Sequence, residues 1–189
     1  MLLIKNFIDK IVATILLVVL FPFLLIISLW LWIALRENPF FLQRRVGKKG
    51  KYFRIVKLKT IGHRKVKVLS FLRTTHIDEL PQLFNILIGS MSLVGPRPHV
   101  PEHVAQYEPW QRERLTVKPG ITCLRQLKSP FNKLEFYQNI EDDVKYAREW
   151  SVRLDLKILL STVVAIFRLL VTKIYHQKPV RTRNTDSFS

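Results

Sequence analysis

The sequence predicts an α+β, mostly helical fold in which one long apolar helix precedes a small basic domain. Three features lead to this prediction: residues 11–35 carry no charge, residues 36–73 are strongly basic, and the rest of the chain alternates helical patterns with turn residues. Hydrophobic residues make up 48% of the 189 residues, yet the net charge is +17, so the two kinds of residue must be segregated along the chain. This length fits one compact domain plus a membrane element.

The apolar segment is long enough to cross a membrane. As an α-helix, residues 11–35 would extend about 38 Å, and the hydrocarbon core of a bilayer is about 30 Å thick. A buried helix of a soluble protein rarely lacks every charge over such a length. Pro22 lies near the middle of the segment, where it predicts a kink because it removes a backbone donor and clashes with the preceding turn.

Basic residues flank the apolar segment on both sides. Lys5 and Lys10 precede it, and Arg36, Arg44 and Arg45 are the first to follow it. The charge bias favours a cytoplasmic location for the C-terminal flank. A kinked helix that enters and leaves the same leaflet would satisfy both flanks, and a straight span with a short outside N-terminus fits as well. The residues alone leave the two topologies open.

The basic region, residues 36–73, contains thirteen Lys or Arg residues and a single acid, Glu37. Within it, residues 51–60 predict a short strand because apolar side chains partly alternate. A basic run beside a membrane segment suits anionic lipid head groups and phosphorylated ligands equally. The basic region therefore leaves two classes of protein open: a membrane-anchored scaffold that binds anionic lipids, and an enzyme that acts on a phosphorylated ligand. Nucleic-acid binding fits less well, because the adjacent membrane segment is awkward for it.

The second half of the chain predicts further helices. Residues 76–90 combine an acidic start with leucines at helical spacing, and Gly89 with Ser90 ends the helix. Residues 101–115 form a polar helical pattern that Pro109 interrupts.

Residues 141–172 read as one or two helices. The part from 154 to 171 is mostly apolar but contains charges, which predicts an amphipathic helix lying on a membrane or packing on the core rather than a second span. Residues 175–189 are polar and basic and predict a disordered tail.

The adjacent carboxylates Asp78 and Glu79 are the first acids after the basic region, and Arg97 follows in a turn stiffened by Pro96 and Pro98. Adjacent carboxylates can hold Mg²⁺ together with substrate phosphates. A carboxylate can also attack phosphorus and form an acyl phosphate, and nearby cations would keep it ionised. Spacing alone nevertheless favours helix capping, which is worth about 1 kcal/mol.

Cysteine and histidine do not form a ligand pattern. The single cysteine, Cys123, rules out an intrachain disulfide and is expected to be a small buried residue. The histidines follow no metal-ligand spacing, and each is expected at the surface: His63, His76, His99, His103 and His176.

Four phrases in order resemble the bacterial sugar transferase family, the monotopic phosphoglycosyl transferases. They are FFLQRRVGKKGKYFRIVKLKT, LRTTHIDELPQLFNILIGSMSLVGPRP, RLTVKPGIT and DVKYAREWSVRLDLKIL. With their spacing they cover roughly residues 5–165. The combination of DELPQ, MSLVGPRP and PGIT is highly specific.

The resemblance implies a membrane-embedded, Pro-kinked re-entrant helix at residues 1–36 and a small cytoplasmic catalytic domain with amphipathic interfacial helices at 37–174. It implies a location at the bacterial inner membrane. Members of this family move a sugar-1-phosphate from a UDP-sugar to a polyprenol (undecaprenyl) phosphate and release UMP. They act in two steps, through a covalent phosphosugar–aspartate, at the first membrane step of surface glycan synthesis such as that of capsule or exopolysaccharide.

The resemblance also assigns roles to residues. Asp78 is the expected nucleophile, and Glu79, with Asp78, is the expected Mg²⁺ ligand. Arg97 is expected to grip phosphate or the nucleotide, between Pro96 and Pro98. Three further basic residues are candidates for binding substrate phosphates or orienting the carboxylates: Lys57, Lys59 and Arg73. Anionic membrane lipids are expected partners, nucleic acid is not, and membrane contacts could support a homodimer.

The chain departs from the family pattern at four places, one of which is a short connection between Lys59-Thr60 and Arg73. Phe21-Pro22 stands where the family usually breaks its membrane helix at Ser-Pro, and Cys123 follows PGIT where a glycine is common. Residues 127–130 replace a polar Asn-Gly-Arg segment that is expected to touch the sugar nucleotide. The last difference bears on which sugar is recognised.

Overall fold

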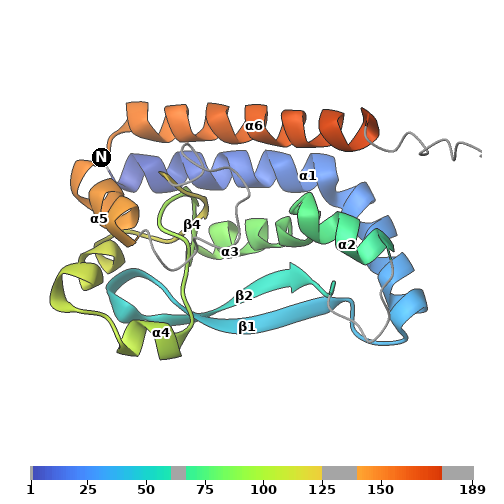
Figure 1. Cartoon of the computed structure of the whole chain (residues 1–189), viewed down its shortest axis with the longest axis horizontal. Coiled ribbons are helices and arrows are strands. Elements are labelled where there is room, and N and C mark those ends of the chain that lie inside the picture. The colour runs from blue at the N-terminus through green and yellow to red at the C-terminus, as the bar shows by residue number, and fades with distance from the viewer. Residues whose placement is uncertain (1, 61–66, 125–139, 176–189) are drawn as a thin grey trace, which may run out of the picture.

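The structure, a computed structural model, describes residues 2–60, 67–124 and 140–175. The fold is α+β and mostly helical, as predicted (Figure 1). Its helices are α1 (Leu2–Leu35), α2 (Lys67–Thr74), α3 (Gln82–Ile88), α4 (Pro101–Ala105), α5 (Ile140–Glu149) and α6 (Val152–Tyr175). Its strands are β1 (Phe40–Val46), β2 (Tyr52–Leu58), β3 (Ser92–Val94) and β4 (Gly120–Thr122). Three 3₁₀ turns, Lys48–Gly50, Ile77–Glu79 and Pro109–Thr116, complete the described elements.

Helix α1 contains Pro22 and changes direction about midway, as Figure 1 shows, so the predicted bend is present. Among the described residues it is the one helix long and apolar enough to cross a membrane. One stripe of α1 is buried at Asp9, Ala13, Leu17, Leu24 and Leu31, a spacing that keeps these residues on one face. This stripe packs on α3 and β3, and the other faces of α1 expose large apolar side chains.

Strands β1 and β2 form an antiparallel hairpin, with Phe40 opposite Leu58 and Val46 opposite Tyr52. The prediction of a strand within residues 51–60 is confirmed. Strand β1 was not predicted, because its apolar residues Phe40 to Leu42 run consecutively and are all exposed instead of alternating. In Figure 1 the hairpin lies at the opposite side of the molecule from α6.

The chain predicted as a helix at 76–90 is a 3₁₀ turn followed by α3, with Pro81 between them. Gly89 ends α3 in the left-handed conformation, with a φ of 88°, as its predicted stop requires. The polar pattern at 101–115 is likewise split at Pro109 into α4 and a 3₁₀ turn.

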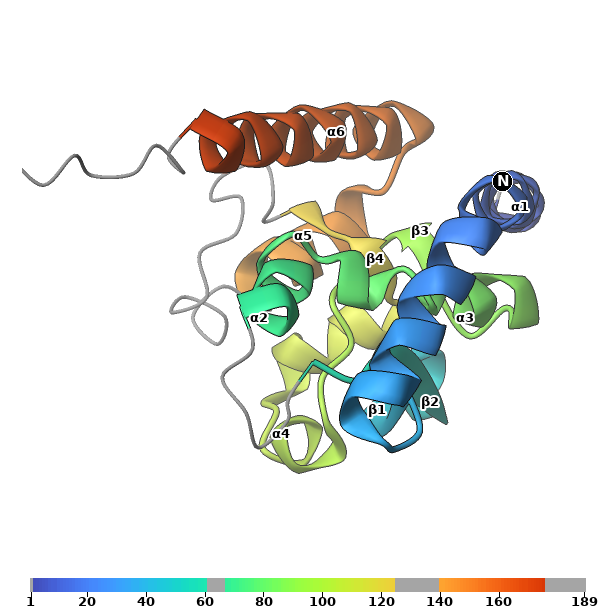
Figure 2. The same cartoon turned by 90° about the vertical axis from the view of Figure 1, so that its right-hand side faces the viewer.

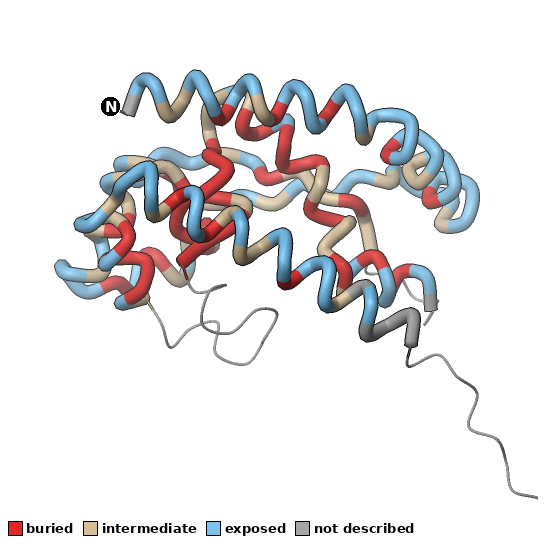
Figure 3. The backbone as a smooth tube through the Cα atoms, turned by 90° about the horizontal axis from the view of Figure 1, so that it is seen from above, coloured by how far each residue is buried: buried red, intermediate tan, exposed pale blue. Residues whose placement is uncertain are grey.

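Two helices, α5 and α6, occupy the region predicted to hold one or two. Helix α6 exposes an apolar stripe at Val152, Leu156, Leu160, Val163 and Phe167, which fits the predicted amphipathic helix. Figures 1 and 2 show α6 and the first half of α1 along one side of the molecule, and Figure 3 shows exposed residues recurring along both helices. Apart from Tyr175, the predicted tail at 175–189 lies outside the described residues.

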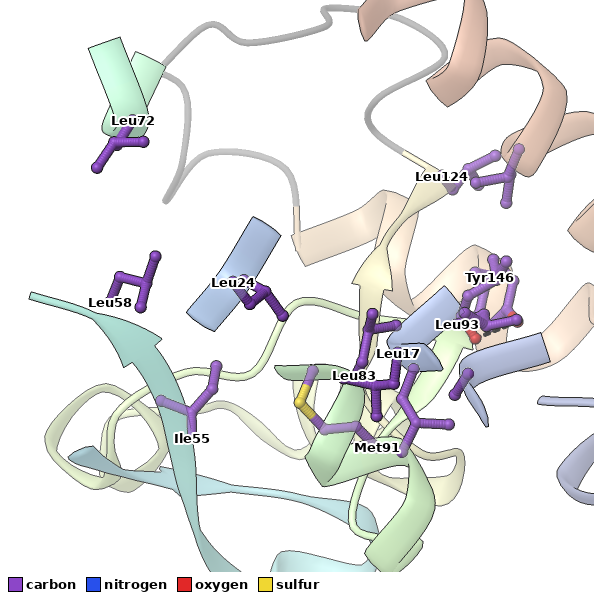
Figure 4. Close-up of a cluster of buried hydrophobic side chains, with 14 of the residues drawn as sticks. Leu17, Leu24, Ile55, Leu58, Leu72, Leu83, Met91, Leu93, Leu124 and Tyr146 are labelled. Atoms are coloured by element: carbon purple, nitrogen blue, oxygen red, sulfur yellow. Dashed lines mark hydrogen bonds between the residues drawn. The ribbon is translucent and has the colours of Figure 1, made fainter. Parts of the chain in front are cut away.

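The core joins α1 to the rest of the domain. In Figure 4, Leu17 and Leu24 of α1 lie among Leu83, Met91 and Ile55 from α3, the segment after it and β2. Apolar burial between these elements stabilises the fold at about 25 cal/mol per Å². Helix α1 is therefore one wall of the core as well as a membrane-length helix.

Polar contacts fasten the first turns of α1 to two other elements, α6 and β3. Lys5 donates to Asp155 of α6 at 2.5 Å, and Ser92 of β3 donates to Asp9 at 2.5 Å. Asp155 also accepts from Tyr146 at 2.6 Å and from Trp150 at 3.0 Å. Buried polar groups cost free energy unless they are hydrogen-bonded, and these are.

Candidate active site

Asp78 and Glu79 lie in the 3₁₀ turn Ile77–Glu79, and both are buried. Helix α3 begins only at Gln82, and neither the turn nor α3 has a side-chain cap. The helix-capping interpretation of the acidic pair was therefore wrong. His76, with a φ of 58°, holds the left-handed backbone that leads into the turn.

Glu79 is held by two cations. Lys57 of β2 donates to Oε1 at 2.8 Å, and Arg97 donates through Nη2 to Oε1 at 2.5 Å and through Nη1 to Oε2 at 3.2 Å. His76 Nδ1 lies 3.9 Å from Oε1. Burial alone would raise the pKa of Glu79, but Arg97, His76 and Lys57 overcome it and hold this pKa well below its usual range.

Asp78 sits in a different environment. Its Oδ1 is buried and, among the described residues, has no hydrogen-bond partner. Burial, and then the neighbouring Glu79, raise the pKa of Asp78 to about 6, against the opposing effect of Lys57, His76 and Arg97. Two adjacent carboxyl groups thus have pKa values pushed apart, which is typical of sites that assign them different tasks.

Asn85 of α3 positions the strand that carries Lys57. Its Oδ1 accepts from the backbone N–H of Val56 at 3.1 Å, and its Nδ2 donates to the carbonyl of Arg54 at 2.8 Å. This places Lys57 beside the 3₁₀ turn that immediately precedes α3. Sequence reasoning missed Asn85. Its only signal in the sequence is that it is a polar residue within the apolar pattern of α3, and the structure shows that it is buried.

The segment that carries Arg97 is bound along its backbone. Gly95 N donates to Thr122 O at 3.0 Å, and Gly120 N donates to Pro96 O at 3.0 Å. The carbonyl of Pro98 accepts from Arg45 at 2.9 Å. These bonds fix the stiff turn that was predicted around Arg97.

The sequence phrases GPRP and PGIT meet because β3 and β4 pair in parallel, Ser92 with Gly120 and Val94 with Thr122. A Cβ atom on Gly95 would overlap the carbonyl oxygen of Lys118, and one on Gly120 would overlap the amide nitrogen of Gly95. Both positions therefore require glycine. Three-residue strands carry too little pattern for this pairing to have been predicted.

The structure brings only some of the predicted substrate-binding residues to the acidic pair. Lys57 and Arg97 contact Glu79, and the buried Pro96 and Pro98 flank Arg97. Lys59 forms its ion pair with Glu37, just beyond the end of α1. Arg73 is exposed in the last turn of α2. Residues 127–130 lie outside the described residues.

One histidine is not where it was predicted. His99 is buried, and its Nδ1 lies 2.5 Å from the hydroxyl of Tyr107. Burial, then Arg114 and the other neighbouring cations, lowers the pKa of His99, so the imidazole is neutral at pH 7. The expectation for Cys123 is confirmed, since it is a small buried residue. His63 and His176 lie outside the described residues.

A membrane-length helix packed on a small domain, with an acidic pair flanked by GPRP and PGIT, defines a recognisable class. The chain belongs to the bacterial sugar transferase family, whose family model matches residues 1–169. It is 37% identical over 183 residues to a UDP-glucose:undecaprenyl-phosphate glucose-1-phosphate transferase of Klebsiella pneumoniae, covering 84% of this chain and 39% of that protein.

Two further relatives extend the comparison. A protein of the same name from Caulobacter vibrioides is 35% identical over 184 residues, covering 86% of this chain and 69% of the relative. The galactosyl transferase CpsE of Streptococcus agalactiae serotype III is 36% identical over 152 residues, covering 67% of this chain and 34% of the relative. The chain thus spans less than half the length of two of these three relatives.

Proposed function

We propose that this protein transfers a sugar-1-phosphate from a UDP-sugar to undecaprenyl phosphate and releases UMP. The observation that carries the proposal is the contrast within the acidic pair. Glu79 is bound by Arg97 and Lys57, whereas the buried Oδ1 of Asp78 has no hydrogen-bond partner in the described part of the chain. The names of the relatives from K. pneumoniae and C. vibrioides support the two substrates.

In the first step, Oδ1 of Asp78 attacks the β-phosphorus of the UDP-sugar. A bond forms between the carboxylate oxygen and phosphorus, and the bond from that phosphorus to the bridging oxygen breaks. UMP leaves with the electron pair on this oxygen. Arg97 and Lys57 lie beside the carboxylates, where positive charge offsets the repulsion between Asp78 and an anionic substrate.

In the second step, a phosphate oxygen of undecaprenyl phosphate attacks the same phosphorus. The bond between phosphorus and the Asp78 oxygen breaks, and the carboxylate is restored. One phosphate site serves both steps, so Arg97 and Lys57 act twice. At pH 7 most Asp78 is ionised, because its pKa is about 6.

The acidic pair fits Mg²⁺. Oδ1 of Asp78 has no hydrogen-bond partner among the described residues, and Oε2 of Glu79 accepts a bond of 3.2 Å from Arg97. In the described residues no cluster of three or more His, Cys, Asp or Glu is present, which suits a cation that takes one or two carboxylates and completes its shell with substrate phosphates and water. When bound, Mg²⁺ would neutralise charge on the diphosphate.

We further propose that α1 is re-entrant at the bacterial inner membrane and that the catalytic domain faces the cytoplasm. The bend in α1 and its two basic flanks support this topology. So does the ion pair between Lys5 and Asp155, at 2.5 Å. A helix whose first turns are bound to the domain that follows its last turn is expected to keep its N-terminus on the same side of the bilayer as that domain. The apolar stripe of α6 and its exposed Arg153 and Lys157 suit the surface of an anionic membrane.

The proposal is tested with purified protein in nanodiscs, Mg²⁺, undecaprenyl phosphate and a panel of UDP-sugars. We expect UMP release from at least one donor and none from the Asp78→Asn variant. Without the acceptor, intact-protein mass spectrometry should find one phosphosugar on wild-type protein and none on the variant. Wild-type turnover by Asp78→Asn would remove Asp78 from the mechanism.

The scaffold alternative makes a different prediction. It expects no UMP from any donor and salt-sensitive binding to anionic vesicles that is unchanged in Asp78→Asn and Glu79→Gln. Topology has its own test: a cysteine added at the N-terminus should resist membrane-impermeant labelling in intact cells if α1 is re-entrant.

A further inference from the structure

Arg114 is a buried cation outside the acidic pair. It lies in the 3₁₀ turn Pro109–Thr116, and the residue is 2% exposed. Its Nη2 donates to the backbone carbonyl of Arg97 at 2.6 Å and to Oδ2 of Asp143 at 2.5 Å, and its Nη1 donates to the hydroxyl of Tyr107. A guanidinium has five donors in a fixed plane, so it can hold three acceptors in one geometry.

The hydrogen bonds that join Arg114, Tyr107 and His99 all donate in one direction, from Arg114 towards His99. Arg114 can only donate, so the Tyr107 hydroxyl accepts from it and directs its own proton to Nδ1 of His99. Neutral His99 is the matching acceptor. Arg114 therefore contacts the segment 97–99 twice: directly at the Arg97 carbonyl, and through Tyr107 at the His99 ring.

We propose that Arg114 is a positioning residue for the acidic pair, acting through the backbone of Arg97. The carbonyls on either side of Arg97 are bound by Gly120 and Arg45, so Arg114 supplies the central fastening of this segment. The Arg97 side chain in turn grips both oxygens of Glu79. A displaced Arg97 would release Glu79 and change the field at Asp78.

Asp143 of α5 is the counter-ion that offsets the free-energy cost of burying Arg114. Its carboxylate lies 2.5 Å from Nη2 of Arg114, and its side chain is 11% exposed. Helix α5 thereby reaches the acidic pair through a chain of four residues, Asp143, Arg114, Arg97 and Glu79, in which the middle link is the backbone carbonyl of Arg97. This role rests on the proposed function, because its main readout is turnover.

The same two elements offer a matched control. Arg148 of α5 forms an exposed ion pair with Glu113, with 2.6 Å and 2.7 Å bonds, between the same helix and the same 3₁₀ turn. Neither bond touches Arg97. Arg148→Lys therefore perturbs an ion pair between α5 and the 3₁₀ turn without touching the fastening of Arg97.

The test is a double-mutant cycle measured by UMP release. Arg114→Lys keeps the charge but loses the planar fork whose two nitrogens reach the three acceptors. We expect kcat to fall about 10- to 100-fold with little change in KM, because misplacing a group by about an ångström has an effect of this size. In an Arg97→Lys background the same substitution should cost less than about threefold, because coupled residues are not additive. An equal loss in both backgrounds, or wild-type turnover by Arg114→Lys, would overturn the proposal. Arg148→Lys should retain wild-type kcat.

Two further measurements keep the outcome decisive. If Arg114→Lys does not fold, Tyr107→Phe replaces it in the cycle, because it removes the hydroxyl and retains the ring packing; we expect a loss of about three- to tenfold, about 1 kcal/mol. If wild-type protein releases no UMP, the proposed function fails by itself. Hydrogen exchange of the backbone amides of residues 94–100 then tests the positioning role. Faster exchange in Arg114→Lys but not in Arg148→Lys supports the role, and equal exchange in both variants rejects it.

Discussion

Asp78 and Glu79 are neighbours in sequence with opposite protonation behaviour, and the cause lies in which of them the cations reach. Arg97 and Lys57 bind Glu79 directly and keep it ionised. Asp78 feels the same cations from farther away and is buried without a hydrogen bond at Oδ1 from the described residues. An ionised carboxylate oxygen that is buried without a hydrogen bond is reactive, and it lowers the free energy of unfolding of the protein.

This arrangement predicts the pH dependence of turnover. Asp78 must be ionised to attack, and its pKa in the folded protein is about 6. We expect kcat/KM for the UDP-sugar to be lowest in acid and to rise through about pH 6 to a plateau. The measurement is UMP release from pH 4.5 to 8.5 at constant ionic strength. A profile that is flat across pH 5 to 7 would contradict the assignment.

The same pKa predicts that Asp78→Asn stabilises the protein. A folded-state pKa of about 6, above the ordinary value of 3.8, means that the fold disfavours the ionised form. This penalty is absent below pH 3.8, grows between the two values and is complete above pH 6. We expect Asp78→Asn to raise the free energy of unfolding by about 1 to 3 kcal/mol at pH 8, since one pKa unit equals about 1.4 kcal/mol, and to leave it unchanged at pH 3.5. Denaturant titration at both pH values measures this.

Glu79→Gln should act in the opposite direction. It leaves Arg97 and Lys57 partly buried without their carboxylate, and breaking such a pair typically costs about 3 kcal/mol. A lower unfolding midpoint at pH 8, beside a higher one for Asp78→Asn, is the expected pair of results. Two stabilising substitutions would mean that the cations do not hold Glu79.

At the scale of elements, β3 and β4 decide where the chemistry-bearing segments lie. They are short, but their parallel pairing brings Gly95 against Gly120. It also fixes the backbone just before Arg97, because the carbonyl of Pro96 accepts from the N–H of Gly120. The hairpin of β1 and β2 supplies Lys57 from the other side, with Asn85 fixing the strand. The acidic pair lies where these elements meet.

Gly95→Ala should be far more damaging than Gly50→Ala. The added methyl at Gly95 meets backbone atoms that cannot move without breaking the β3–β4 pairing, and overpacking of this kind costs about 1 to 3 kcal/mol or more. At Gly50 there is open space, and the cost is the positive φ of 73° alone, about 1 kcal/mol. The two variants are compared by thermal unfolding and by UMP release. Gly95→Ala should lose both stability and turnover, and Gly50→Ala should keep turnover.

Sequence reasoning predicted the elements with long or strongly marked patterns. The charge-free segment 11–35 of α1, the strand β2, the Gly89 stop and the break at Pro109 all follow from local chemistry. It missed β1, β3 and β4, whose side chains do not alternate or whose length is three residues. It also missed His99 and Arg114 as buried polar residues, because their burial depends on partners distant in the chain, such as Asp143.

At the scale of the whole molecule, α1 is both a wall of the core and a membrane-length helix. Its buried stripe is apolar except for Asp9, which Ser92 of β3 binds at 2.5 Å. Two kinds of contact thus hold α1: apolar packing along the stripe, and polar bonds at its first turns.

Ser92→Ala tests the polar bonds of α1. It removes the hydroxyl that donates to buried Asp9, and an unsatisfied buried acceptor costs about 1 to 3 kcal/mol. Thr14→Ala on the same helix removes an exposed bond to the carbonyl of Lys10 and should change stability by less than about 0.5 kcal/mol. Denaturant unfolding in detergent micelles measures both, and equal effects would mean that Asp9 does not fasten α1.

The ion pair between Lys5 and Asp155 joins residues 150 positions apart, and this separation orders events during synthesis. Helix α1 leaves the ribosome before its partner on α6 has been translated. The apolar helix therefore meets the bilayer before Asp155, the partner of Lys5, has been synthesised. Closing so long a loop is a slow step. A nascent chain arrested before Asp155 would already be bound to the membrane, with the bond from Lys5 to Asp155 not yet formed.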